Sequence, residues 1–117
     1  MKKTDLARLK ALAEKIAARC PPPMPCSFKW CHNPLYVDGK RACGYKQLFL
    51  NGQRYSAVLA IDVTEPYLVA RDTLVHEWAH LLSWTPAHDA GAFGPHGPEW
   101  GVAYARAYCA SVDEHFH

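Results

Sequence analysis

Two histidines and a glutamate stand close together in the second half of the chain, as His76, Glu77 and His80 of the segment H-E-W-A-H. On a helix, residues four positions apart lie on the same face, so both imidazoles can reach one cation. Glu77 lies about 100° around the helix from His76 and can approach a metal-bound water without binding the metal itself. The spacing is therefore typical of a zinc site with a carboxylate base beside it.

The residues around this segment help to separate a metal site from a chance pattern. Two histidines and a glutamate can also decorate the surface of a helix, and so short a pattern arises by chance. Here, however, Leu74 and Val75 precede the segment, and Leu81 and Leu82 follow it. Unpaired His and Glu side chains are costly to bury in such apolar surroundings, and a bound metal ion removes that cost. We therefore favour the metal site.

A third ligand must come from elsewhere, because a catalytic zinc commonly has three protein ligands and a water. The candidates are His88, Asp89, His96 and Glu99. His96 is preferred because it stands just before a predicted helix that opens at Pro98, which can aim the imidazole back at the metal. His88 and Asp89 follow the motif closely and are expected on the surface or in a lid. Glu99 is equally well explained as a helix cap or as a partner of a ligand histidine.

The two histidine segments together resemble the SprT-like zinc metallopeptidases, which include the Spartan proteases. The segment H-E-W-A-H is followed, after fifteen residues, by His96-Gly97-Pro98-Glu99-Trp100, and the family shows H-E-x-x-H, a loop and then H-G-x-x-aromatic. The resemblance implies that His76, His80 and His96 bind one Zn²⁺ ion and that Glu77 is the catalytic base. It also implies hydrolysis of peptide bonds in a protein or peptide substrate by a water that the zinc and Glu77 activate.

The resemblance extends over nearly the whole chain, but it leaves the family's link to DNA repair open. An N-terminal helix, a small antiparallel sheet and the segment Glu65-Pro66 before the active-site helix match the family's layout. Many members carry a C-terminal zinc ribbon or a DNA-binding tail, and this sequence contains no Cys-x-x-Cys pair. Action on DNA-associated proteins is therefore an extension of the expected activity that this sequence does not secure.

Two other functions remain open at this point. One is a non-catalytic, zinc-stabilised module that binds nucleic acid or protein, and the other is a different zinc hydrolase, such as an amidase. A structural zinc site needs no base, so the presence of Glu77 favours an enzyme. A fourth protein ligand from His88 or Asp89 would favour the structural alternative.

The elements that position these residues follow from hydrophobic periodicity and from proline and glycine. Apolar residues at helical spacing indicate a first helix, which the proline-rich run 21–25 ends. Asn51-Gly52 is a strong hairpin signal, and Pro98 suits the first position of a helix. The sequence predicts helices over 4–19, 70–84 and 98–111, strands over 26–31, 41–50 and 53–63, and loops over 32–39 and 85–97.

Together these elements predict an α+β fold: a single zincin-like minimal metallopeptidase domain over residues 1–117. It contains an N-terminal helix, a small three-stranded antiparallel sheet, an active-site helix and a C-terminal helix. From the strand order of the family, the very apolar strand 56–63 is expected at the sheet edge. An extended substrate could add to such an edge by strand pairing.

Several aromatic and histidine residues near the motif have weaker expected roles. Tyr104, Tyr108 and His88 are candidates for a second oxyanion donor, although aromatic residues at helical spacing more often belong to a core. Trp78 and Trp84 are expected in the core and not at a substrate surface.

The formal charge of +2 is unevenly distributed along the chain. Residues 1–54 carry eleven Lys and Arg against three acids, a net +8, whereas residues 55–117 carry two against eight, a net −6. A basic region can contact nucleic acid, so DNA contact through the basic N-terminal half is one hypothesis. A solvated helix face with scattered surface lysines explains the same asymmetry more simply.

The chain has five cysteines, which are Cys20, Cys26, Cys31, Cys43 and Cys109. The odd number and the lack of a signal sequence argue against a disulfide framework. Cys26, Cys31 and Cys43, with His32 nearby, would be the ligands of a second zinc site, but free core or strand thiols are the simpler interpretation.

Composition and patterning also bound the environment of the protein. Residues 5–19 form an amphipathic pattern and not the apolar core of a signal peptide. No apolar run approaches the roughly 20 residues that span a bilayer. We therefore expect a cytoplasmic monomer that has no membrane partner.

Overall fold

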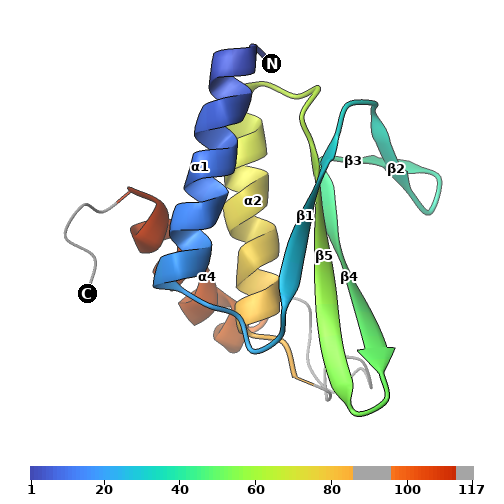
Figure 1. Ribbon diagram of the computed structural model, residues 1–117, viewed down its shortest axis with the longest axis vertical. Coiled ribbons are helices and arrows are strands. Elements are labelled where there is room, and N and C mark those ends of the chain that lie inside the picture. Colours follow the sequence, from blue (N-terminus) through green and yellow to red (C-terminus); the bar gives the residue numbers. More distant parts are fainter. Residues whose placement is uncertain (86–95, 113–117) are drawn as a thin grey trace.

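In the part of the chain that the structure describes, the helices lie on one side of a small β-sheet (Figure 1). The computed structural model describes residues 1–85 and 96–112. Its elements are, in chain order, α1 (Lys3–Arg19), β1 (Cys26–Cys31), β2 (Leu35–Val37), β3 (Lys40–Ala42), β4 (Gly44–Asn51), β5 (Arg54–Asp62), α2 (Tyr67–Leu82) and α4 (Pro98–Val112). Within these described ranges, no helix is both long enough and apolar enough to cross a membrane. The predicted α+β class is confirmed.

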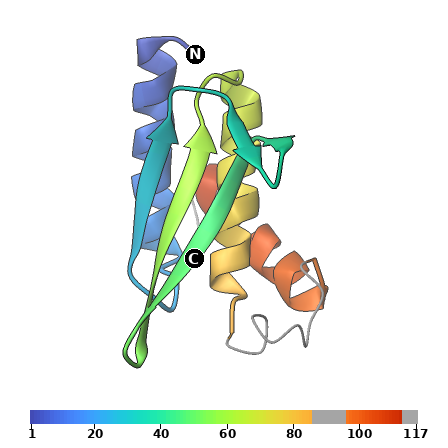
Figure 2. The same ribbon diagram turned by 90° about the vertical axis from the view of Figure 1, so that its right-hand side faces the viewer.

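The central strand of the main sheet is β5, which lies between β1 and β4 (Figure 2). It pairs antiparallel with β4 and parallel with β1, where Cys26 is opposite Ala57. Two predictions are therefore wrong: the sheet is mixed and not antiparallel throughout, and the strand predicted over 56–63 is not at the edge. Consecutive buried residues from Leu59 to Asp62 are typical of a central strand. The edges of the sheet are β1 and β4.

A second, two-stranded sheet formed by β2 and β3 stands beside the first. The sequence predicted a loop over most of this region and a strand that began at residue 41. Instead, Asp38 and Gly39 adopt φ angles of 52° and 77° and close a hairpin in which Val37 pairs with Lys40. Asp-Gly is a strong hairpin signal for this reason, since both positions tolerate positive φ.

The predicted hairpin is confirmed, but its turn lies one residue later than predicted, at Gly52 and Gln53: Asn51 pairs with Arg54, and Gly52 has a φ of 65°. The three predicted helices are also present. The second begins at Tyr67, three residues before the predicted start, directly after Pro66, whose extended backbone suits the position before a helix.

The helix α2 lies at the centre of the core, in contact with α1, α4, β4 and β5. Leu9 of α1 and Leu74 of α2 are fully buried, and Trp78 is 1% exposed. Burial of each such side chain contributes about 1.5–3 kcal/mol. The Trp78 indole also donates a hydrogen bond of 2.9 Å to the Cys20 carbonyl, which joins α2 to the end of α1. Trp78 and Trp84 are core residues, as predicted.

A buried carboxylate fixes the connection from β5 to α2. Asp62, at the end of β5, is 0% exposed. It accepts hydrogen bonds from Arg41 Nη2 at 2.9 Å and from the Thr64 backbone N–H at 2.8 Å. Burial alone would raise the pKa of Asp62, but these bonds, with those from the Thr64 hydroxyl and the Leu35 N–H, hold the pKa below its ordinary value. The β2–β3 hairpin and the start of α2 are thereby held together.

Candidate metal centre

Three histidines from two helical segments meet at one point. His76 and His80 lie one turn apart on α2, and His96 lies just before α4 begins at Pro98. The Nε2 atom of His76 is 3.2 Å from that of His80 and 3.3 Å from that of His96. One ligand atom from each histidine lies within 4.8 Å of the other two, so the three side chains are close enough to bind a metal ion.

The spacing of these nitrogens fits a tetrahedral metal site. Zn–N bonds of about 2.0–2.1 Å with tetrahedral angles place two ligand nitrogens roughly 3.4 Å apart. The two Nε2 separations, 3.2 and 3.3 Å, agree with this value. Imidazole ligands suit zinc, copper, iron and nickel, so the donor set defines a metal site and not the metal's identity.

Burial favours the protonation state that ligation requires. Removal from water lowers the pKa of His76, and the charge of His96 lowers it further. A histidine must be neutral to bind a metal through its lone pair. His76 is therefore in the binding-competent form over a wider pH range than an exposed histidine.

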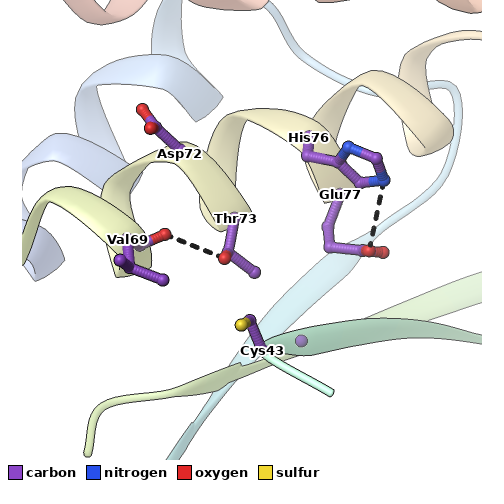
Figure 3. A pocket seen from close by; sticks show the side chains of 7 residues that line it. Cys43, Val69, Asp72, Thr73, His76 and Glu77 are labelled. Carbon is purple, nitrogen blue, oxygen red and sulfur yellow. Dashed lines mark hydrogen bonds and ion pairs between the residues drawn. The ribbon is translucent and has the colours of Figure 1, made fainter. Parts of the chain in front are cut away.

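Glu77 lies beside the three histidines but does not belong to the group of potential metal ligands. Its side chain points from α2 toward β4, and Oε1 lies 3.9 Å from His76 Nε2 (Figure 3). Burial raises the pKa of Glu77 to about 7, and the positive charge of Lys46 on β4 opposes this effect. A carboxylate that titrates near neutral pH can both accept and return a proton, as general acid–base catalysis requires.

The indole of Trp100, in the first turn of α4, packs against all three histidines. The centroid of its ring lies 5.1 Å from that of His76, 5.7 Å from that of His80 and 4.8 Å from that of His96. Its Nε1–H also donates to the His76 carbonyl at 3.4 Å. Sequence reasoning gave Trp100 no role of its own at the site, although its spacing of four residues from His96 was a signal for this contact.

A groove opens between α2 and the first residues of β4, directly beside Glu77 (Figure 3). Its volume of about 420 Å³ lies in the usual range of ligand sites. It is lined by Cys43, Gly44, Val69, Asp72, Thr73, His76 and Glu77. Sequence reasoning missed the contribution of Val69, Asp72 and Thr73, which stand seven, four and three residues before His76 and so share its side of the helix.

Beside the groove, β4 approaches α2 closely at a glycine. A Cβ atom on Gly44 would lie only 2.6 Å from Thr73 Cγ2 and 2.8 Å from the Ala60 carbonyl oxygen. A residue larger than glycine therefore does not fit at position 44 unless the strand or the helix shifts. The contact brings the edge strand to within van der Waals reach of the helix that carries Glu77.

Other predicted site residues lie apart from the histidines. Glu99 is in the first turn of α4 and is not a member of the metal-binding group. The Tyr104 ring packs against Trp100 in a tilted arrangement with a centroid distance of 5.1 Å, and Tyr108 stacks on Tyr104 at 6.4 Å, so this row leads away from the metal centre. His88 and Asp89 lie outside the described residues.

The cysteines do not form a second metal site in the described part of the chain, where the three histidines are the one group of potential ligands close enough to share an ion. All five thiols are free. Burial raises the pKa of Cys20, of Cys31 and of Cys26, the last to about 11. A raised pKa disfavours the thiolate that binds metals, in agreement with the simpler interpretation of these residues.

Several arginines of the basic half, residues 1–54, make ion pairs or ring contacts within the protein. Arg8 lies 4.3 Å above the Tyr67 ring and pairs with Asp5, and Arg41 pairs with Asp62 and with Glu65. Charges that are engaged inside the molecule contribute less to an external partner, so the +8 count overstates the basic surface.

Comparison of the chain with protein-family models, with curated proteins and with solved structures returned no match. The features that bear on function are therefore the geometry of the three histidines, of Glu77 and of the adjoining groove.

Proposed function

We propose that this protein is a zinc metallopeptidase of the SprT-like type, with His76, His80 and His96 as the zinc ligands and Glu77 as the base. The observation that carries the proposal is the convergence of three imidazole nitrogens at tetrahedral spacing, with a buried carboxylate beside them and not among them. A hydrolytic zinc site has three protein ligands and keeps a fourth position for water, and a carboxylate that is not a ligand can act on that water as the base.

Zinc in such a site supplies Lewis acidity toward a carbonyl oxygen and toward a water. Glu77 accepts the proton of the attacking water and delivers it to the departing amine, so its position near His76 places it at the reacting centre. Trp100 holds the three imidazole rings in their relative orientation through ring contacts and through its hydrogen bond to the His76 carbonyl.

The substrate is a protein or peptide segment in extended form. The edge strand β4 carries β5 on one side, and within the described residues no strand pairs with its other side. An extended peptide can add to this free edge through backbone hydrogen bonds. Gly44, at the start of β4, and Glu77 line the same groove, so a segment added at this end of β4 would lie beside Glu77. Strand addition at β4 thus replaces the expected addition at strand 56–63.

The test combines metal analysis with cleavage of a denatured protein by the zinc-loaded chain, with and without single-stranded DNA. Glu77→Gln should keep stoichiometric zinc and lose about 100- to 10,000-fold in cleavage rate, the usual contribution of a general base. Glu99→Gln is the matched control, an exposed acid outside the histidine group, and should cleave like the wild type.

Equal cleavage by the wild type and Glu77→Gln would refute the role of Glu77. Zinc at stoichiometric level without cleavage by the wild type would favour the alternative, a non-catalytic zinc-stabilised binding module. Stimulation by DNA that weakens as salt rises would extend the function to DNA-associated proteins, since such contacts depend on charge.

A further inference from the structure

The edge strand β4 and the helix α2 run side by side in the same direction (Figure 1). They do so because β4 is antiparallel to β5, and α2 turns back over the sheet directly after β5. The two elements meet at Gly44, where an added Cβ would contact Thr73 of α2. From that contact, two residues of strand advance about 6.6 Å and four residues of helix advance about 6 Å. Lys46 of β4 is therefore level with Glu77 of α2.

The side chain of Lys46 lies on the helix side of the sheet. Side chains alternate between the two faces of a strand, so residues 44, 46 and 48 share one face. The Cβ direction of Gly44 leads to α2, and Leu48 packs against the hydrophobic core. Lys46, which stands between them, therefore projects toward α2, and Glu77 points from α2 toward β4 (Figure 3). In agreement, the charge of Lys46 opposes the rise that burial causes in the pKa of Glu77.

The ammonium group of Lys46 is not used by the fold. The residue is partly buried, and within residues 1–85 and 96–112 no hydrogen bond or ion pair engages its side chain. Arg41 differs in this respect, because it pairs with both Asp62 and Glu65. A partly buried charge without a partner is unfavourable until an anion pairs with it. An anion that forms between β4 and α2 would therefore meet a donor that is already in place.

Peptide hydrolysis produces such an anion beside Glu77. When a water attacks the scissile carbonyl carbon, a C–O bond forms, Glu77 takes one proton of the water, and the π electrons of the carbonyl move onto its oxygen. When the C–N bond then breaks, these electrons restore the carbonyl, and the departing amine takes the proton from Glu77. The carbonyl oxygen thus carries a negative charge only between the two steps. A fixed donor that pairs more strongly with this oxyanion than with the neutral carbonyl lowers the barrier.

We propose that Lys46 is a second catalytic residue, whose ammonium donates a hydrogen bond to the oxyanion and keeps its own proton throughout. The proposal rests on the peptidase function above and assigns the oxyanion donor of the same site. The tyrosines considered from sequence, Tyr104 and Tyr108, belong to a row of rings that leads away from the metal centre. A peptide that adds to the start of β4 runs beside Lys46 and Glu77 alike, so one substrate reaches both the donor and the base.

The test compares zinc-loaded wild type and Lys46→Met on a fluorogenic peptide, since methionine keeps an unbranched apolar stem and removes the charge. The kcat should fall about 10- to 100-fold and KM should change less than about threefold, because the lost contact exists only in the transition state. Donors in closed sites contribute about 100- to 1,000-fold, and Lys46 is partly exposed to water. Lys46→Arg keeps a cationic donor and should give an intermediate kcat. Lys29→Met, an exposed lysine on β1, is the matched control and should cleave like the wild type.

Binding gives a second measurement that does not depend on turnover. It uses a phosphinic peptide, a tetrahedral anion that imitates the oxyanion, and the zinc-loaded Glu77→Gln protein, in which Lys46 has no Glu77 carboxylate to act through. Adding Lys46→Met to this protein should weaken the phosphinic peptide about 10- to 100-fold and leave the affinity for the uncleaved substrate peptide unchanged. A structural role of Lys46 would weaken both ligands or neither.

Two outcomes separate this proposal from the peptidase function. A wild-type kcat in Lys46→Met, or an equal loss of affinity for both ligands, overturns the role of Lys46 and leaves the peptidase standing. Binding of the phosphinic peptide that depends on Lys46, without cleavage by the wild type, supports Lys46 as the anion donor of the site and overturns the hydrolytic function.

Discussion

Two polar clusters lie on α2 or just before its start. They differ in what satisfies their polar groups: other protein groups in one cluster, and a bound cation in the other. Around Asp62, protein groups satisfy the buried carboxylate, through Arg41 and the backbone of Thr64 among others. At the histidine cluster, three lone-pair donors face one another at 3.2 and 3.3 Å, an arrangement that a cation completes. The first cluster therefore serves folding and the second serves binding, although both place ionisable groups in or beside the core.

The sharpest test of this contrast is removal of the third histidine. His96→Ala should weaken zinc affinity by more than about 100-fold, because loss of residues that merely support a ligand already costs 10- to 100-fold. Zinc affinity is measured by competition with a chromogenic chelator. In the presence of excess chelator, the unfolding free energy should change by less than about 0.5 kcal/mol, since His96 is exposed and outside the core.

His32→Ala is the matched control for this experiment, because His32 is also exposed but lies outside the metal-binding group. It should leave both zinc affinity and stability unchanged. A His96→Ala protein that keeps wild-type zinc affinity would show that the histidine cluster is not the metal site.

The converse variant is Asp62→Asn, which should cost stability and leave zinc affinity intact. The amide puts a donor where Oδ2 accepted hydrogen bonds from Arg41 and the Leu35 N–H, or where Oδ1 accepted those from Thr64. An unsatisfied buried group of this kind costs about 1–3 kcal/mol. The difference from wild type is measured by urea unfolding of both metal-free proteins near pH 7.

The same pair of proteins should converge in acid. The folded-state pKa of Asp62 is depressed by its hydrogen bonds, so its contribution is complete above the unfolded pKa of about 3.9 and is lost as pH falls through the lower folded value. Asp38→Asn, an exposed acid in the β2–β3 turn, should show neither the neutral-pH loss nor the convergence. A constant difference between wild type and Asp62→Asn at all pH values would argue against the ionic role of Asp62.

The contrast between the clusters also explains which features could be predicted from sequence. The pair His76 and His80 follows from helical spacing, and the hairpin at Asn51-Gly52 follows from local backbone preference. His96 lies twenty residues from His76, and helical spacing does not connect the two. Its position just before the helix that opens at Pro98, and the resemblance of its segment to a known motif, suggested that the chain would bring them together.

Features that depend on long-range pairing could not be predicted in the same way. The parallel pairing of β1 with β5 joins segments about thirty residues apart, and no local pattern specifies it. The Arg41–Asp62 pair and the approach of Lys46 to Glu77 depend on that topology. Helical spacing places Asp72 on the same side of α2 as His76, but the groove that it lines could not be predicted without the position of β4.

An effect on stability of similar size is expected at Gly44, which follows the β2–β3 hairpin in the chain and lines the groove beside Glu77. Gly44→Ala should destabilise the protein by about 1–3 kcal/mol, because the new methyl meets both Thr73 Cγ2 and the Ala60 carbonyl. Zinc affinity should not change, since no histidine ligand contacts the residue. The matched control is Gly101→Ala, where the added Cβ meets nothing within 4 Å and a helical alanine should be neutral or stabilising by up to about 1 kcal/mol.

A second substitution separates the two contacts at Gly44. Thr73→Ser removes Cγ2 and keeps the hydroxyl that donates to the Val69 carbonyl. In the Gly44→Ala background it should recover only part of the lost stability, because the contact with the Ala60 backbone cannot be relieved by a side-chain change. Full recovery would mean that β4 shifts freely at this point. In that case the hydrogen bonds of Asp62 would stabilise the fold, but they would not set the distance between β4 and Glu77. The shape of the groove depends on that distance.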